Sequence, residues 1–340
     1  GCVCCGKGEG GEKEEEEEEE REERAMLRWA VLAVSITLCF ASSPVVIQQN
    51  VPACALGRAK SFMVGFTGHT GSTAFMSILK QHSELRVPAL EPLCNREDKL
   101  SYTQSFFHIA EGDGRHRVPG FKLRHADLMK FPDGFAELIQ DRETRLITLV
   151  RENFFKAGLG LYTVRALMDN SAVMGRKVGV NSEDPCVRDP SLCRFEVRNI
   201  KFLAYLVLRY EAGTKVVRSI ANAMPWSCEL VVTYEEFLRD MRGTMTKVYD
   251  YLGVGQEERR PGLAKVVNDN PCAVVSNYQE VCAKLWGCSA IRPFLEDPAN
   301  NCFCADKTLP ADPMLCSLNS LLKQNMICLD AGGKEVLCES

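Results

Sequence analysis

The sequence lacks the charge surplus that marks a nucleic-acid-binding protein. Its 340 residues carry a formal net charge of −4, and residues 1–25 alone carry −7, which leaves +3 on the remainder. Nucleic-acid binders concentrate far more Lys and Arg than this on one face. The composition therefore indicates no nucleic-acid partner, although a mildly basic body is compatible with an anionic ligand.

The paired cysteine and histidine spacing of a zinc site is also absent from the C-terminal part of the chain. Cysteine itself is abundant, because 13 of the 17 cysteines lie after residue 47. This number favours an oxidising compartment. We therefore predict no metal, and a disulfide-bonded C-terminal region in which at least one thiol of the odd total is free or intermolecular. The cysteines that crowd this region are Cys272, Cys282, Cys288, Cys302, Cys304, Cys316, Cys328 and Cys338.

Charge is absent from one apolar run, residues 29–47, which is about long enough to cross a bilayer. Arg21, Arg24 and Arg28 lie just before this run, and the next basic residue after it is Arg58. By the positive-inside rule the N-terminus stays cytoplasmic and the body is lumenal. We therefore predict a single-pass anchor at residues 29–47, which tethers the protein to the membrane.

Two other interpretations of the N-terminal end remain open. A start at Met26 would turn the apolar run into a cleavable signal peptide, and the protein would then be secreted. The opening Gly1-Cys2-Val3-Cys4-Cys5 resembles a lipidation site, although Cys5 stands where the motif wants Ser or Thr. The Glu-rich residues 1–25 predict a disordered acidic tail. No N-x-[ST] glycosylation acceptor occurs, which neither supports nor excludes the secretory route.

From residue 61 onward, strand-like and helix-like segments alternate. Buried strands are predicted at 61–66, 120–123, 145–150 and 229–233. Helices are predicted at 71–80, 126–140, 153–168, 197–223 and 235–252. This alternation predicts an α/β fold whose P-loop-like, mostly parallel sheet is flanked by helices on both faces. Such a sheet binds ligands outside the carboxyl ends of its strands.

The turn between the first predicted strand and the first helix has the composition of an anion-binding loop. Unpaired N–H groups at a helix start, together with the helix dipole, stabilise a phosphate, and glycine lets the backbone approach it closely. Nucleotide triphosphatases use a similar turn but require G-x-x-x-x-G-K-[ST]. Ser72 follows Gly71 here instead of Lys, so a nucleotide-kinase interpretation loses its central cation.

Residues 69–73 resemble the 5'-phosphosulfate loop of sulfotransferases that use 3'-phosphoadenosine 5'-phosphosulfate (PAPS) as co-substrate. The family's loop has a basic residue, then Ser or Thr, Gly, Ser or Thr, and Thr. His69 stands in the basic position, where the family generally has Arg or Lys, so the charge of this site depends on pH. The resemblance implies that PAPS is bound by Gly68, His69, Thr70, Gly71, Ser72 and Thr73.

A second resemblance follows the strand predicted to end at Val150. Arg151 matches the family's 3'-phosphate arginine, and a guanidinium can fork two N–H groups onto one phosphate. The family carries a Ser about two turns further on, which falls near Gly160 in this chain. One phosphate contact is therefore missing, unless Tyr162 or Thr163 replaces it.

A third resemblance lies at residues 231–238 and 249–254, which match the family's strand, Tyr-Glu-Glu segment and closing helix. It implies that Tyr234 lies near the adenine. Residues 276–281 resemble the end of carbohydrate-type members of the family. We therefore predict a sulfotransferase domain at residues 60–285 and a Cys-rich extension at 286–340.

Sulfuryl transfer requires a base that removes the acceptor proton. Glu91 occupies the position where several branches of the family hold a glutamate base, and the prolines beside it stiffen its segment. His125 and His108 are alternative bases, since cytosolic branches use His. Lys122 and Arg124 end another predicted strand and could face the sulfate or an anionic acceptor.

The sequence thus predicts a membrane-anchored sulfotransferase of the Golgi type, which moves the sulfuryl group of PAPS to an acceptor hydroxyl. A carbohydrate is the expected acceptor. A non-catalytic lumenal binding protein that retains the fold is the alternative, motivated by His69 and Gly160. A nucleotide kinase is a third interpretation.

Overall fold

The structure of this chain, a computed structural model, describes residues 57–88, 93, 96–111, 116–166, 194–223, 229–261, 270–308, 312–323, 327–329 and 335–337. The predicted acidic tail at 1–25, the predicted anchor at 29–47 and the predicted base Glu91 lie outside the described residues. Within the described ranges, no helix has both the length and the apolar character of a membrane span.

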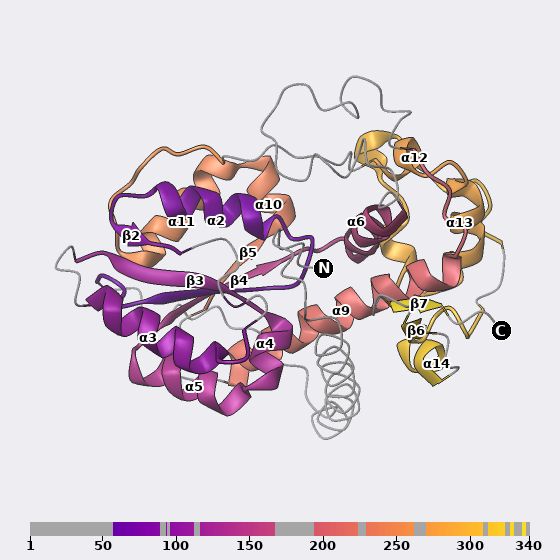
Figure 1. Ribbon diagram of the computed structural model, residues 1–340. Coiled ribbons are helices and arrows are strands. Elements are labelled where there is room, and N and C mark those ends of the chain that lie inside the picture. The colour runs from indigo at the N-terminus through magenta and orange to yellow at the C-terminus, as the bar shows by residue number, and fades with distance from the viewer. Residues whose placement is uncertain are drawn as a thin grey trace, which may run out of the picture.

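A five-stranded parallel sheet forms the centre of the fold (Figure 1). Its strands follow the order β2-β3-β1-β4-β5. They are β1 (Phe62–Phe66), β2 (Leu85–Arg86), β3 (Val118–Arg124), β4 (Arg145–Val150) and β5 (Glu229–Thr233). Phe66 lies opposite both Arg124 and Leu149, and Val150 lies opposite Thr233, so four carboxyl ends meet at one edge. The winding reverses between β1 and β4, which is where open α/β sheets bind ligands.

Helices cover both faces of the sheet (Figure 1). One face carries α2 (Ser72–Gln81), α10 (Tyr234–Arg239) and α11 (Met241–Leu252), and the other carries α3 (Lys99–Glu111), α4 (His125–Lys130) and α5 (Pro132–Asp141). Strands β1 and β4, which lie inside the sheet, are mainly apolar because both of their faces are buried. In β1, for example, Phe62 and Val64 belong to the core of the first set of helices, and Met63 belongs to that of the second. The predicted α/β fold class is confirmed.

A second core lies beside the sheet, along the long helix α9 (Ile200–Ala223) (Figure 1). Val217 of helix α9 packs against Gly65 of β1, and Leu203 of the same helix lies in the second core. Helix α9 therefore connects the sheet with the second core. The elements of this part are α6 (Phe154–Ala166), α12 (Pro271–Val274), α13 (Tyr278–Leu285), η3 (Arg292–Phe294), η4 (Pro298–Asn300), α14 (Leu318–Lys323), β6 (Ile327–Leu329) and β7 (Glu335–Leu337).

Three disulfides between described residues stabilise the second core. Cys272 is bonded to Cys302, Cys282 to Cys304 and Cys288 to Cys316, across 30, 22 and 28 residues of sequence. In the chain-entropy model each bond of this span stabilises the fold by roughly 3.5 kcal/mol. The predicted disulfide-bonded C-terminal region is confirmed, and two of the bonds cross the boundary predicted at residue 285.

The helices predicted at 126–140 and 235–252 are each two helices. In the first, Pro132 begins α5, because a residue without an N–H can start a helix but cannot continue one. In the second, the Asp240 carboxylate accepts a hydrogen bond from the N–H of Gly243 at 2.8 Å and caps α11. The sequence pattern predicts neither β2 nor α3.

Helix α6 and helix α9 approach each other closely at Gly158. A Cβ atom at this position would lie 2.8 Å from Cγ2 and 2.9 Å from the backbone N of Val207. A helix backbone cannot move aside as a flexible side chain can, so glycine is required for this packing. The contact determines where α6 lies, and α6 begins directly after the loop that follows β4.

We predict that Gly158→Ala lowers the free energy of unfolding by about 1–3 kcal/mol, because the added methyl group overpacks the α6–α9 contact. Gly160→Ala is the matched control in the same helix, since its Cβ would lie 3.3 Å from the His69 ring, a side chain that can shift. Urea unfolding followed by circular dichroism measures both variants. Equal stabilities of the two variants would contradict the role of Gly158.

Candidate functional site

The loop after β1 delivers the chain into the first turn of α2. His69 (φ 57°) and Gly71 (φ 70°) both have left-handed backbone conformations, and the Thr70 hydroxyl donates to the carbonyl of Thr67 at 2.9 Å. Gly71 is the N-cap of α2 and has no side chain that could cap the first N–H groups of the helix. The first amides of this ten-residue helix, beside Ser72 and Thr73, therefore lie at the type of helix start that can bind an anion, and the predicted binding of PAPS there stays a prediction.

Two tyrosines pack against the glycines of this loop. A Cβ on Gly71 would lie 2.8 Å from the Tyr234 ring, and a Cβ on Gly68 would lie 2.9 Å from the Tyr210 hydroxyl. Tyr234 comes from the start of α10, directly after β5, and Tyr210 comes from α9. Both glycines leave space for an aromatic side chain, and Gly71 also adopts the left-handed backbone conformation that favours glycine.

Arg151 connects this loop with the end of β4. Its Nη1 donates to the carbonyl of His69 at 3.1 Å, and its guanidinium carbon lies 4.5 Å from the centre of the Tyr234 ring. Its Nε lies 3.9 Å from Oε1 of Glu235, and only 6% of the residue is exposed. The predicted loop, Arg151 and Tyr234 thus lie together at the carboxyl edge of the sheet.

Glu235 joins the ends of β4 and β5. Its carboxylate accepts hydrogen bonds from the backbone N–H groups of Glu152 at 3.0 Å and Asn153 at 3.2 Å. Sequence reasoning did not select Glu235 or Tyr210. Glu235 could have been found as the neighbour of Tyr234, whereas Tyr210 carries no signal in the sequence, because α9 brings it from a distant part of the chain.

Lys122 and Arg124 lie on β3, next to β1. The buried Lys122 donates from Nζ to Oγ1 of Thr73 at 3.4 Å, and the same Nζ lies 4.9 Å from the centre of the Phe66 ring. The backbone N–H of Arg124 donates to Asp127 at 3.3 Å, and Asp127 forms an ion pair with Lys99 of α3 at 2.9 Å. Lys122 therefore adds positive charge beside the start of α2, while α3 supports the end of β3.

His125, the first residue of α4, lies close to the loop after β1. Burial, assisted by the charges of Arg209 and Arg124, lowers the pKa of His125 to about 4, although a hydrogen bond with the Phe66 backbone opposes the shift. A neutral imidazole is the form that can accept a proton. The other alternative base, His108, is exposed on α3.

The two positions that depart from the family's pattern lie side by side. A Cβ on Gly160 of α6 would lie 3.3 Å from Nδ1 of His69. The residues considered as replacements for the missing serine are engaged elsewhere: the Tyr162 hydroxyl accepts from the N–H of Asn199 at 3.2 Å, and the Thr163 hydroxyl donates to Leu159 O at 2.8 Å. The imidazole of His69 lies next to Gly160.

The described residues contain no group of three or more His, Cys, Asp or Glu side chains that could hold a metal ion. The arrangement at the carboxyl edge is instead one of backbone amides, hydroxyls, Lys122 and Arg151, which suits an anion with more than one phosphate-like group. The roles assigned to the individual side chains stay predictions.

Neither a protein-family model nor a curated protein matches the chain. Solved structures similar to it include a sulfotransferase from Alicyclobacillus acidocaldarius, with 14% identity, a TM-score of 0.39, and coverage of 72% of this chain and 99% of that one. The sulfotransferase domain of the Synechococcus PCC 7002 olefin synthase has 14% identity, a TM-score of 0.34, and coverage of 79% of this chain and 95% of the domain.

We predict that the protein loses stability as the pH falls from about 6.5 to about 4, the pKa values of His125 in the unfolded and folded chains. In this window the unfolded chain binds more protons than the folded one, so acid lowers the free energy of unfolding, by at most about 3 kcal/mol. Denaturant titrations at several pH values measure the loss. His125→Gln should remove this part of it, and pH profiles that stay parallel in the two proteins would contradict the prediction.

Proposed function

We propose that this protein transfers the sulfuryl group of PAPS to an acceptor hydroxyl. The observation that carries the proposal is the contact between Arg151 and the carbonyl of His69, at 3.1 Å. It brings an arginine suited to a 3'-phosphate next to a helix start suited to a 5'-phosphosulfate. The nucleotide would then span the point between β1 and β4 where the winding of the sheet reverses.

Each part of the donor has a proposed partner at this edge. The amides at the start of α2, together with Ser72 and Thr73, bind the 5'-phosphosulfate, and Lys122 adds a positive charge beside Thr73. Arg151 binds the 3'-phosphate. Tyr234, whose ring lies under the Arg151 guanidinium, contacts the adenine.

In the proposed reaction the acceptor oxygen attacks sulfur, and the bond between sulfur and the bridging oxygen of the 5'-phosphate breaks. The electron pair of that bond stays on the phosphate, which leaves as adenosine 3',5'-bisphosphate. The acceptor proton passes to the base, for which we propose Glu91. Charge builds up on the leaving oxygen, and the α2 amides and Lys122 would stabilise it, because preorganised donors act most strongly where charge develops.

The proposed acceptor is a carbohydrate hydroxyl, and the proposed location is the Golgi lumen, with residues 29–47 as the membrane anchor. The three disulfides support an oxidising compartment. The resemblance of residues 276–281 to carbohydrate-type sulfotransferases supports the acceptor class.

We predict that Arg151→Ala weakens the binding of adenosine 3',5'-bisphosphate by about 10- to 100-fold, as expected for the loss of charge-assisted hydrogen bonds to a phosphate. Isothermal titration calorimetry measures the affinity. Arg198→Ala is the matched control, because 87% of that side chain is exposed. Normal affinity of the Arg151→Ala variant would remove Arg151 from the donor site and with it the main support for the proposed function.

We predict that Glu91→Gln abolishes sulfate transfer, because the amide cannot accept the proton, while nucleotide affinity stays within about twofold of the wild type. Transfer of radiolabelled sulfate from PAPS to a panel of glycans measures the activity. Glu97→Gln, at an exposed position of the same region, is the control. Unchanged turnover would reject Glu91 as the base, and a wild-type protein that binds nucleotide but sulfates no acceptor would favour the non-catalytic alternative.

A further inference from the structure

The segment that carries Arg151 is a short, tightly bonded turn at the start of α6. The N–H groups of Glu152 and Asn153 are held by Glu235, and the Asn153 side chain accepts from the N–H of Lys156 at 2.8 Å. Asn153 thereby caps α6, so a movement of the first turn of this helix would carry Arg151 with it.

The first turn of α6 is anchored from outside by the disulfide-bonded part of the chain. Nζ of Lys156 lies 2.7 Å from Oδ2 of Asp297, and the two side chains are only 16% and 10% exposed. The Phe154 ring packs edge-on against the Phe294 ring at a centroid distance of 5.2 Å, and Asn153 donates to Phe294 O at 3.5 Å. All three contacts join residues about 140 positions apart in the sequence. They link the segment after β4 to the cysteine-rich region.

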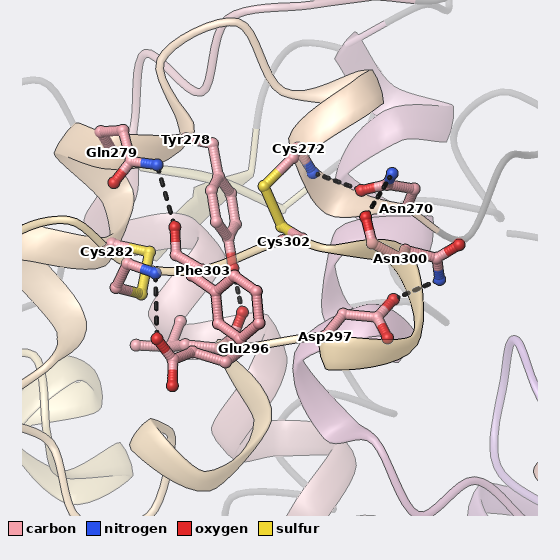
Figure 2. Close-up of a disulfide and its surroundings, with 12 residues drawn as sticks. Asn270, Cys272, Tyr278, Gln279, Cys282, Glu296, Asp297, Asn300, Cys302 and Phe303 are labelled. Carbon is pink, nitrogen blue, oxygen red and sulfur yellow. Dashed lines mark hydrogen bonds between the residues drawn. A yellow bond between two sulfur atoms is a disulfide. The ribbon is translucent and has the colours of Figure 1, made fainter.

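Asp297 is itself held by hydrogen bonds to its backbone and to its carboxylate. Its backbone exchanges two hydrogen bonds with Cys302, at 2.9 and 3.1 Å, and its carboxylate accepts from the Asn300 side chain at 2.6 Å. Cys302 forms a disulfide with Cys272, whose N–H donates to Asn270 at 3.0 Å. Figure 2 shows this disulfide close to Asn270, Asp297 and Asn300. The two backbone hydrogen bonds thus close the short loop that presents the Asp297 carboxylate, and the disulfide joins the end of this loop to Cys272 of α12.

The charge state of Asp297 suits this anchoring role. Burial alone would raise the pKa of its carboxyl, but the hydrogen bonds from Lys156 and Asn300 and the charge of Lys156 outweigh it, so the pKa is lowered. A buried ion pair of this kind contributes less to net stability than to a defined geometry, because desolvation offsets much of the attraction.

We propose that Lys156 and Asp297 are positioning residues for the donor site. The Cys272–Cys302 disulfide holds Asp297, Asp297 holds Lys156, and the first turn of α6 thereby holds Arg151 against the loop after β1. The inference rests on the proposed function of Arg151 in donor binding. It makes the cysteine-rich region an integral part of that site, and nucleotide affinity becomes dependent on one particular disulfide.

The disulfides offer a matched pair of variants. Cys272→Ser with Cys302→Ser removes the bond behind Asp297, whereas Cys288→Ser with Cys316→Ser removes a bond of nearly equal span, 28 residues against 30. Both variants lose a similar entropic restraint on the unfolded chain. We expect the first to weaken adenosine 3',5'-bisphosphate binding about tenfold, as displaced positioning groups do, and the second to change it less than about twofold. Equal effects of the two, or no effect of the first, would overturn the inference.

Substitutions at Lys156 test the same link with all disulfides intact. Lys156→Met should weaken nucleotide binding, and Lys156→Arg, which keeps the charge beside Asp297, should restore most of it. If the Cys272/Cys302 variant does not fold, these Lys156 variants still test whether the ion pair with Asp297 positions the donor site. A Lys156→Met protein that binds with wild-type affinity would contradict the inference.

Amide hydrogen exchange separates the inference from the proposed function, because it needs no nucleotide. Protection of the amides at residues 154–158 should fall in the Cys272/Cys302 variant and stay unchanged in the Cys288/Cys316 variant. Failure of the wild type to bind adenosine 3',5'-bisphosphate would refute the proposed function only. Unchanged exchange at the start of α6 would refute the mechanical link itself.

Discussion

The hydrogen bond from Arg151 to the carbonyl of His69 is the contact on which the candidate site depends. A guanidinium that is almost completely buried must be hydrogen-bonded or paired. Arg151 meets this demand with a carbonyl from the loop after β1, the ring of Tyr234 and the carboxylate of Glu235 after β5. The partners follow different strands, and the register of the parallel sheet brings them to the same edge. Through its hydrogen bond to His69, Arg151 also holds the loop that leads into α2.

Much of the sheet could be predicted from the sequence, since β1, β4 and β5 are short runs that are mainly apolar and rich in β-branched residues or phenylalanine. The predicted bounds of β4 (145–150) and β5 (229–233) match the structure. The helices were harder, because a capping residue such as Asp240 or a proline such as Pro132 divides an apolar pattern without interrupting it. Helix α3 carries a weak helical pattern of its own, and its position depends on packing Phe107 against Phe121 of β3, a tertiary contact.

The candidate site could be predicted where its residues directly follow strands, because parallel strands bring such residues to one edge. The loop after β1, Arg151 and Tyr234 are of this kind. Tyr210 and the Lys156–Asp297 pair are not, since α9 and the disulfide-bonded region bring them from elsewhere in the chain. Spacing within a sequence predicts neighbours along one element, whereas these contacts depend on how two cores pack against each other.

The two departures from the family's pattern, His69 and Gly160, motivate the non-catalytic alternative when each is counted as a separate loss. The structure shows that the two positions are neighbours. A Cβ atom at position 160 would lie 3.3 Å from Nδ1 of His69. The imidazole at 69 and the residue at 160 therefore share one small space. An imidazole can donate or accept a hydrogen bond, as a serine hydroxyl can. Because the two positions adjoin, they describe one local change of the candidate site, and its effect on activity stays a prediction.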